Sequence, residues 1–154
     1  MNRTFSIFPI GKVTRNKEEV VIQISKKYIP ALKQLEHFSH AQVLWWADKV
    51  DNEEFRNKFQ MKPPYGRYPP TTGLFASRAE YRPNPIALTT VRIIELDHRT
   101  NKISINNIDA LDGTPVLDLK AYFPVCDRVK DVKIPEWIVR WPEWYPEEGF
   151  GLEY

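Results

Sequence analysis

The sequence predicts a mainly β fold, in which a small single-domain β-barrel carries a few short helices and ends in a Trp-rich C-terminal tail. Short stretches that alternate apolar and polar residues, rich in β-branched side chains, recur as far as residue 122. Turn-forming residues separate these stretches at the short intervals typical of all-β proteins. With 154 residues, of which 42% are hydrophobic, the chain is long enough for one domain with its own core. These observations favour a barrel or a strongly curled sheet.

Roughly seven strands and two short helices are expected from these patterns. The expected strands span residues 4–13, 19–24, 41–46, 72–77, 86–96, 102–108 and 114–122. Residues 41–46 are apolar on both faces, which predicts a central, buried strand. Apolar residues at helical spacing predict one short helix over residues 28–36. A second helix is expected over residues 51–59, with Asp51 as its N-cap.

The C-terminal tail differs in composition from the rest of the chain. We expect a barrel domain over residues 1–132 and a tail over residues 133–154 that packs on the barrel or on a partner subunit. The tail contains Trp137, Trp141 and Trp144 and carries five acidic against two basic residues. Its rings either pack on protein surface or form a stacking wall for a flat substrate. The preceding part carries 20 basic against 15 acidic residues, a balance that could suit nucleic acid on one face.

Several kinds of site are excluded by what the sequence lacks. No apolar run approaches the roughly 20 residues that span a bilayer, and no signal-peptide segment opens the chain, so no membrane partner and a cytoplasmic location are expected. The nucleotide-binding motifs G-x-G-x-x-G and G-x-x-x-x-G-K-[ST] are missing. The histidine spacing suits no metal, so no metal site is predicted. Cys126, the single cysteine, is expected to be a small buried hydrophobe rather than a reactive thiol.

Two segments stand apart from ordinary barrel sequence, and the first surrounds Asn84. Pro83 and Pro85 restrict the backbone on both sides of this asparagine, and Arg78 and Arg82 precede it. The pattern is typical of a rigid corner between strands. It also suits a preorganised site for an anion or a carboxylate, because planar guanidinium groups bind carboxylates through two hydrogen bonds.

The second segment lies between the last two expected strands. Asp112 and Gly113 form a strong turn signal, so Asp109 and Asp112 are expected at a strand end, where backbone groups are free. The two carboxylates could be simple turn formers. They could equally hold ribose hydroxyls or a cationic ligand.

Both segments resemble motifs of the TsaA-like, or TrmO-like, methyltransferase family. Residues 76–88 read A-S-R-A-E-Y-R-P-N-P-I-A-L, similar to the family's A-T-R-S-x-x-R-P-N-P-I-G-L. Residues 109–124 are similar to its D-L-x-D-G-T-P-V-L-D-I-K-P-Y-x-P. Residues 35–40 match L-E-x-F-S-H, and residues 9–13 match P-I-G-x-V. The four motifs occur in the family's order and cover residues 7 to about 127.

The resemblance implies a β-barrel that binds S-adenosyl-L-methionine and works as a homodimer. The best-known activity of the family is N6-methylation of a threonylcarbamoyl-adenosine next to the tRNA anticodon, which implies tRNA as partner. The cofactor contacts that the motifs imply are Arg78, Leu88, Asp109, Ala110, Leu111 and Asp112. The expected substrate contacts are Arg82, Asn84 and Lys120. No catalytic residue is assigned, because in-line methyl transfer needs mainly positioning and exclusion of water.

Three departures from the family pattern keep other functions open. The Pro-Arg-Gln segment that usually follows the first strand is missing, and Ala47-Asp48 replaces a His-Gln pair; both contact the cofactor in the family. The acidic tail stands where longer members have a C-terminal domain thought to help hold tRNA. A small-molecule methyltransferase, with the tail closing over its pocket, is therefore one alternative. A non-catalytic module that binds S-adenosyl-L-methionine is the other.

Overall fold

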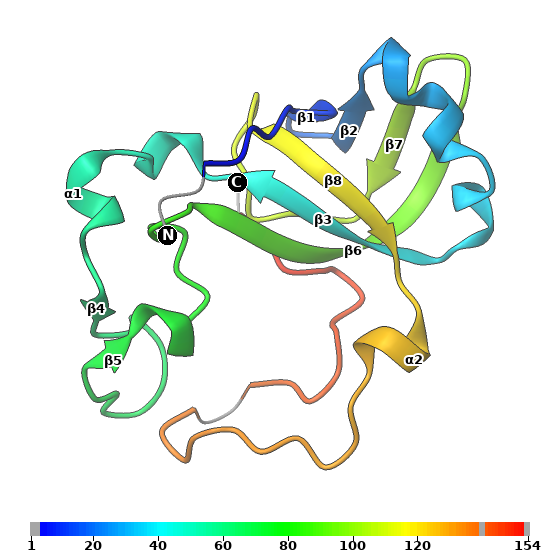
Figure 1. Ribbon diagram of the computed structural model, residues 1–154. Coiled ribbons are helices and arrows are strands. Elements are labelled where there is room, and N and C mark those ends of the chain that lie inside the picture. The colour runs from blue at the N-terminus through cyan, green and yellow to red at the C-terminus, as the bar shows by residue number, and fades with distance from the viewer. Residues whose placement is uncertain (1–3, 139–140, 153–154) are drawn as a thin grey trace.

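The fold is built around a closed antiparallel barrel, shown in Figure 1. The computed structural model describes residues 4–138 and 141–152. Around the barrel the strands follow the order β1-β2-β7-β6-β3-β8. They are β1 (Gly11–Arg15), β2 (Val20–Ile24), β3 (His40–Trp46), β6 (Ile86–Asp97), β7 (Lys102–Ile105) and β8 (Pro115–Ala121). The predicted mainly β barrel is confirmed.

Alternation along the strands fills the barrel with aliphatic and aromatic side chains. On β3, Ala41, Val43 and Trp45 are buried, and the residues between them are half-buried. This strand pairs with β6 on one side and β8 on the other, so the central position expected for residues 41–46 is confirmed. Full burial of one large aliphatic side chain contributes roughly 1.5–3 kcal/mol. The packed barrel is therefore a rigid frame on which loop residues can be held.

Shorter elements lie outside the barrel. Strands β4 (Gln60–Met61) and β5 (Thr72–Gly73) form a separate two-stranded sheet. The short helical segments are η1 (Lys26–Leu32), η2 (Leu35–His37), η3 (Asp48–Val50), α1 (Glu53–Arg56), η4 (Leu74–Ala76) and α2 (Pro124–Asp127). None of the helices in the described part of the chain combines the length and apolar character that crossing a bilayer requires.

Several expected elements differ from the structure. Residues 4–10 form neither strand nor helix, so the strand expected over residues 4–13 is confined to β1, and the helix expected over residues 51–59 is limited to α1. The strand expected over residues 72–77 ends at Gly73, because the chain then turns into η4. The helix expected over residues 28–36 is divided into η1 and η2. Pro30 has no N–H to donate within the first segment, and Gln34 takes a left-handed φ of 72° between the two.

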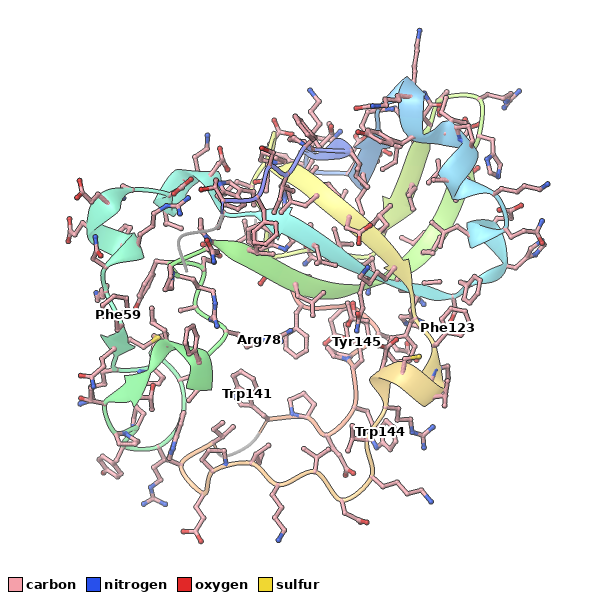
Figure 2. The ribbon with its side chains drawn as sticks, in the orientation of Figure 1. Phe59, Arg78, Phe123, Trp141, Trp144 and Tyr145 are labelled. Atoms are coloured by element: carbon pink, nitrogen blue, oxygen red, sulfur yellow. The ribbon has the colours of Figure 1, made fainter. Side chains whose placement is uncertain are left out.

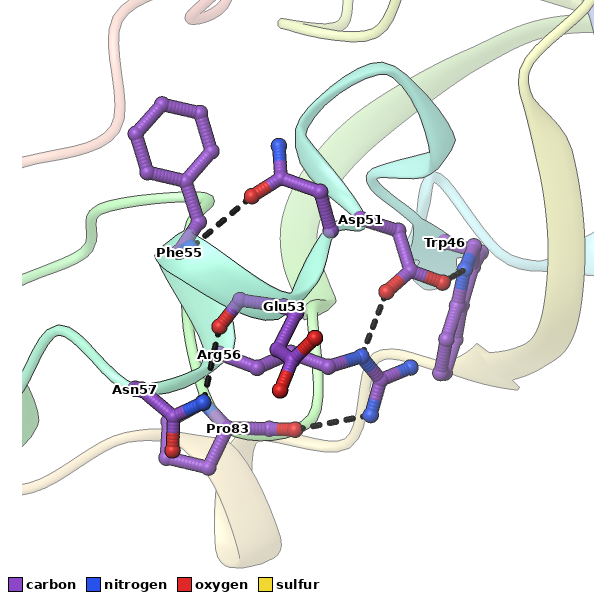
Figure 3. A network of polar contacts seen from close by, with 8 residues as sticks. Trp46, Asp51, Glu53, Phe55, Arg56, Asn57 and Pro83 are labelled. Carbon is purple, nitrogen blue, oxygen red and sulfur yellow. Dashed lines mark hydrogen bonds and ion pairs between the residues drawn. The ribbon is translucent and has the colours of Figure 1, made fainter.

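The start of α1 corrects the expected N-cap. Asn52, rather than Asp51, accepts a hydrogen bond from a backbone N–H of the first turn, at 2.9 Å. Asp51 instead accepts from Trp46 Nε1 at 3.0 Å and from Arg56 Nε at 2.5 Å (Figure 3). Arg56 also donates to the carbonyl oxygen of Pro83 at 3.0 Å. The network fastens α1 to the proline-rich corner before β6.

The tail leaves α2, crosses the open side of the molecule and returns to the barrel (Figure 1). Its first part packs on the loop before β5, where the ring of Tyr65 lies 6.1 Å from Trp137 and 4.9 Å from Trp141. Its last part meets the barrel at Asn106, which donates a hydrogen bond to the Tyr145 hydroxyl at 3.2 Å. The tail thus forms an arch, which contacts the rest of the protein near its beginning and near its end.

Cys126 does not belong to the core, contrary to expectation. It lies in α2, a single helical turn on the surface beyond the end of β8, and its side chain is exposed. The apolar neighbours that suggested burial, Pro124 and Val125, are exposed as well.

Candidate functional site

The site lies at one end of the barrel, where the carboxylate of a loop residue, Asp109, accepts the last of a series of hydrogen bonds between buried side chains. Trp45 points into the barrel from β3, and its Nε1 donates to the hydroxyl of Thr89 on β6 at 3.0 Å. The Thr89 hydroxyl donates in turn to a carboxylate oxygen of Asp109. Trp45 and Thr89 are only 2% and 6% exposed. Two barrel strands therefore fix the position of Asp109.

Arg15, at the end of β1, holds the rest of this loop. Its guanidinium donates to the carbonyl oxygens of Ile108 at 2.9 Å and Ala110 at 2.6 Å, and to the Asn107 side chain at 3.2 Å. The Arg15 backbone N–H donates to a carboxylate oxygen of Asp112 at 2.9 Å. Asp112 thus has a structural role at the turn, and Ala110 is buried with its carbonyl directed at Arg15.

The segment between β5 and β6 is a tight turn with Arg82 at its centre. One guanidinium nitrogen of Arg82 donates to the carbonyl oxygens of Leu74 and Ser77, each at 3.2 Å, and of Ala79 at 3.4 Å. The Ser77 hydroxyl also donates to Leu74, at 2.8 Å. Nη1 of Arg82 is therefore engaged inside the loop.

Arg78, on the same turn, is exposed and lies against β6. Its Nη2 donates to the carbonyl oxygen of Leu88 at 3.1 Å. Figure 2 shows Arg78 on the side of the barrel that faces the arch of the tail. Trp141 and Tyr145, which belong to the tail, lie on the same side. A guanidinium in this position is accessible to an anionic ligand.

Two adjoining hollows surround these residues. The first has a volume of about 250 Å³, and Arg78, Glu80, Leu88 and Asp109 are among its lining residues. The second, of about 150 Å³, shares Glu80 and Asp109 and adds Leu111. Four of the six expected cofactor residues thus come together. Ala110 and Asp112 line neither hollow and contact Arg15, and their role in cofactor binding stays a prediction.

Glu80 was not predicted as a site residue, although it lies in both hollows. Burial raises the pKa of its carboxyl above the usual range, and the nearby negative charge of Asp109 raises it further. Nothing in the sequence indicated this, because Glu80 occupies a variable position of the motif. Arg15 was missed as well, since its partners lie more than 90 positions away along the chain.

The three expected substrate residues do not converge. Arg82 lines the larger of the two hollows. Asn84 lines a separate hollow of about 1070 Å³, together with Trp46 and residues 4–9. Lys120 lies on the outside of β8, where its Nζ pairs with Asp118 at 2.7 Å. Their assignment to one substrate stays a prediction.

Known proteins identify the family of this chain. Residues 3–128 match the family model described as the tRNA-methyltransferase O N-terminal domain. The chain belongs to the tRNA-methyltransferase O family. The solved structure titled TrmO from Pseudomonas aeruginosa is similar, with a TM-score of 0.66 and 26% identity, over 88% of this chain and 62% of that one. The family resemblance inferred from the four motifs is confirmed.

The curated relatives that this chain matches differ in length. A probable S-adenosyl-L-methionine-binding protein of Methanocaldococcus jannaschii is 38% identical over 79% of this chain and 95% of its own length. One of the same description from Archaeoglobus fulgidus is 38% identical over 77% of this chain, which spans 30% of that relative. The tRNA (adenine(37)-N6)-methyltransferase of Escherichia coli is 33% identical over 66% of this chain and 43% of its own length.

Replacing Glu80 tests the charge balance of the site. Glu80→Gln should raise the thermal unfolding midpoint near neutral pH, because the wild-type protein ionises a half-buried carboxyl beside Asp109. Its folded pKa lies above its unfolded value, so the penalty is absent below the unfolded pKa of about 4.3 and complete above the folded one. Scanning calorimetry should therefore find the gain at neutral pH and lose it near pH 4. An equal gain for the exposed Glu148→Gln control, or one that persists in acid, would contradict this account.

Proposed function

We propose that the chain is an S-adenosyl-L-methionine-dependent methyltransferase whose cofactor binds in the two hollows at the barrel end. The observation that carries the proposal is the convergence of Arg78, Leu88, Asp109 and Leu111, from three separate segments, on adjoining hollows. The names of relatives support it, since one is described as binding S-adenosyl-L-methionine and another as a tRNA methyltransferase.

The residues present fit the chemistry of this cofactor. Arg78 can pair with its carboxylate, and Asp109 can accept hydrogen bonds from ribose hydroxyls or an ammonium group. Asp48 lines the smaller hollow with a buried Oδ1 that has no hydrogen-bond partner among the described residues, so a ligand donor would satisfy it. Leu88 and Leu111 offer apolar contact to a flat adenine.

The chain's own contribution would be binding, orientation and exclusion of water. The cofactor supplies a methyl group on positively charged sulfur, and direct displacement requires no covalent intermediate with the protein. Asp109 is held by Thr89, and its loop is held by Arg15. Because these contacts exist before any ligand arrives, little ordering cost is added on binding.

We propose tRNA as the acceptor, at N6 of a threonylcarbamoyl-adenosine next to the anticodon. The family and the printed activity of the Escherichia coli relative support this finer assignment. Arg78, Arg128 and Lys130 are exposed basic residues in or just after the two site segments. A small-molecule acceptor is the second candidate, because Leu152 of the tail lines the smaller hollow and would restrict access to it.

Arg78→Ala should weaken binding of S-adenosyl-L-methionine by about 1.5–3 kcal/mol, roughly 10- to 150-fold, the range for hydrogen bonds to charged groups. Isothermal titration calorimetry would measure the affinity, and thermal unfolding would show that the fold is intact. Arg99→Ala, an exposed arginine in the β6–β7 turn, is the matched control and should bind as the wild type does. Unchanged affinity in folded Arg78→Ala would remove Arg78 from the cofactor site.

A two-fold homodimer is also proposed, on the basis of exposed apolar surface. Phe5, Ile7 and Phe8 are 76%, 52% and 72% exposed and line the largest of the hollows described above. Apolar patches of this kind mark interfaces. Light scattering at micromolar concentration should give twice the chain mass of 18.2 kDa, and Phe8→Glu should shift it toward the monomer. Phe59→Glu, at an exposed phenylalanine outside this patch, should not; a monomeric wild type would refute the dimer.

Salt dependence distinguishes the two candidate acceptors. If tRNA is the substrate, its binding should fall steeply with salt, and Lys130→Ala should reduce the slope of log affinity against log salt by about 0.7–0.9. Lys17→Ala, in the β1–β2 turn, serves as control. Methyl incorporation should appear in bulk tRNA and not in a metabolite extract. Salt-insensitive binding together with incorporation into the extract would favour the small-molecule candidate.

A further inference from the structure

The last part of the tail is seated on the barrel by Asn106. The amide nitrogen of Asn106 donates to the Tyr145 hydroxyl at 3.2 Å and to the carbonyl oxygen of Glu147 at 3.1 Å. Its amide oxygen accepts from the backbone N–H of Arg92 on β6 at 2.9 Å. The ring of Tyr145 also packs edge-on against His40, with centroids 5.6 Å apart. One asparagine thus joins the tail to the edge of the barrel.

Two glycines let the tail lie directly on residues 106–107. Gly149 has a φ of +81°, and a Cβ there would approach the Asn106 side chain to 2.6 Å. A Cβ at Gly151 would come within 2.0 Å of the Asn107 side chain. Asn107 is held in place, because its Oδ1 accepts from Arg15 Nη2 at 3.2 Å and from the Ile108 N–H at 2.8 Å. Any larger residue at position 151 would lift the chain.

This seating brings Leu152 to the candidate site. Leu152 lines the hollow of about 150 Å³ whose other lining residues include Trp45, Glu80, Asp109 and Leu111. The family match ends at residue 128, so this contact comes from a part of the chain that the family model does not describe. In a hollow with three acidic side chains, Leu152 is one of the apolar lining residues, together with Leu111, Trp45, Ala47 and Val50.

We infer that the C-terminal tail forms one wall of the cofactor site in the same chain, with Leu152 as the contact residue and Gly149 and Gly151 as the residues that position it. The inference rests on the proposed function. Leu152 packs with Leu111 against the nucleoside part of the cofactor and keeps water from the charged groups beneath. The tail rests on Asn107, and Arg15 holds both Asn107 and the backbone of the loop that carries Asp109. The same contacts therefore position the wall and Asp109.

Two variants test the wall at different points. Gly151→Val lifts the tail, and Leu152→Ser keeps it seated but removes the apolar contact. Calorimetric titration with S-adenosyl-L-methionine and with S-adenosylhomocysteine should show at least 10-fold weaker binding for Gly151→Val. For Leu152→Ser a loss of roughly 3- to 10-fold is expected, as for a partly buried leucine. Trp144→Ala, on the same tail but 63% exposed and packed against Arg128, should bind as the wild type does.

A second measurement monitors the tail itself. Chymotrypsin should cut the tail of the free protein, and saturating cofactor should protect the tail of the wild type and of Trp144→Ala but not that of Gly151→Val. Equal affinity of both test variants and the wild type would overturn the inference and leave the proposed function standing. Tighter binding by Gly151→Val would also overturn it, because the tail would then obstruct the site. A wild-type protein that binds neither ligand would instead refute the proposed function.

Discussion

The candidate site depends on Arg15, which belongs to the first strand and holds a loop near the end of the barrel sequence. Its guanidinium satisfies two backbone carbonyls and the side chain of Asn107. Hydrogen bonds from a charged donor are worth about 1.5–3 kcal/mol, and half-buried carbonyls left without a donor carry a similar penalty. Because Gly151 rests on Asn107, one side chain supports both the loop that carries Asp109 and the tail that covers it.

The charge within the site is a second constraint. A hydrogen bond from Thr89 holds Asp109 near Glu80, and burial and the charge of Asp109 together raise the pKa of Glu80. The repulsion between two negatively charged carboxylates held in this way is unfavourable in the free protein. A cationic group bound near them removes this repulsion. S-adenosyl-L-methionine carries both an ammonium and a sulfonium. The arrangement therefore favours a positively charged ligand over a neutral one of the same shape, and it does so through barrel contacts that already exist.

The sequence predicted local structure well and long-range contacts poorly. Alternation located β6 and β8 within about two residues, because one face of each strand must be buried. It could not give the order of strands around the barrel or the two-residue length of β5, which depends on a turn closed by Ser77. Motif resemblance indicated six cofactor residues, of which Arg78, Leu88, Asp109 and Leu111 line the two hollows. It had no means of finding Arg15, whose role exists only when β1 lies beside the loop.

The tail shows how a part of the chain without family motifs can still belong to the site. Ala47 and Asp48, where the sequence departs from the His-Gln pair of the family, line the same small hollow as Leu152. A short side chain at Ala47 leaves room that the tail can fill, and Asp48 brings a buried oxygen that lacks a partner among the described residues. Substitutions at Ala47, at Asp48 and in the tail therefore change the shape and polarity of the same hollow. Their effects on ligand binding are expected to be coupled rather than additive, as for any residues that share a cavity.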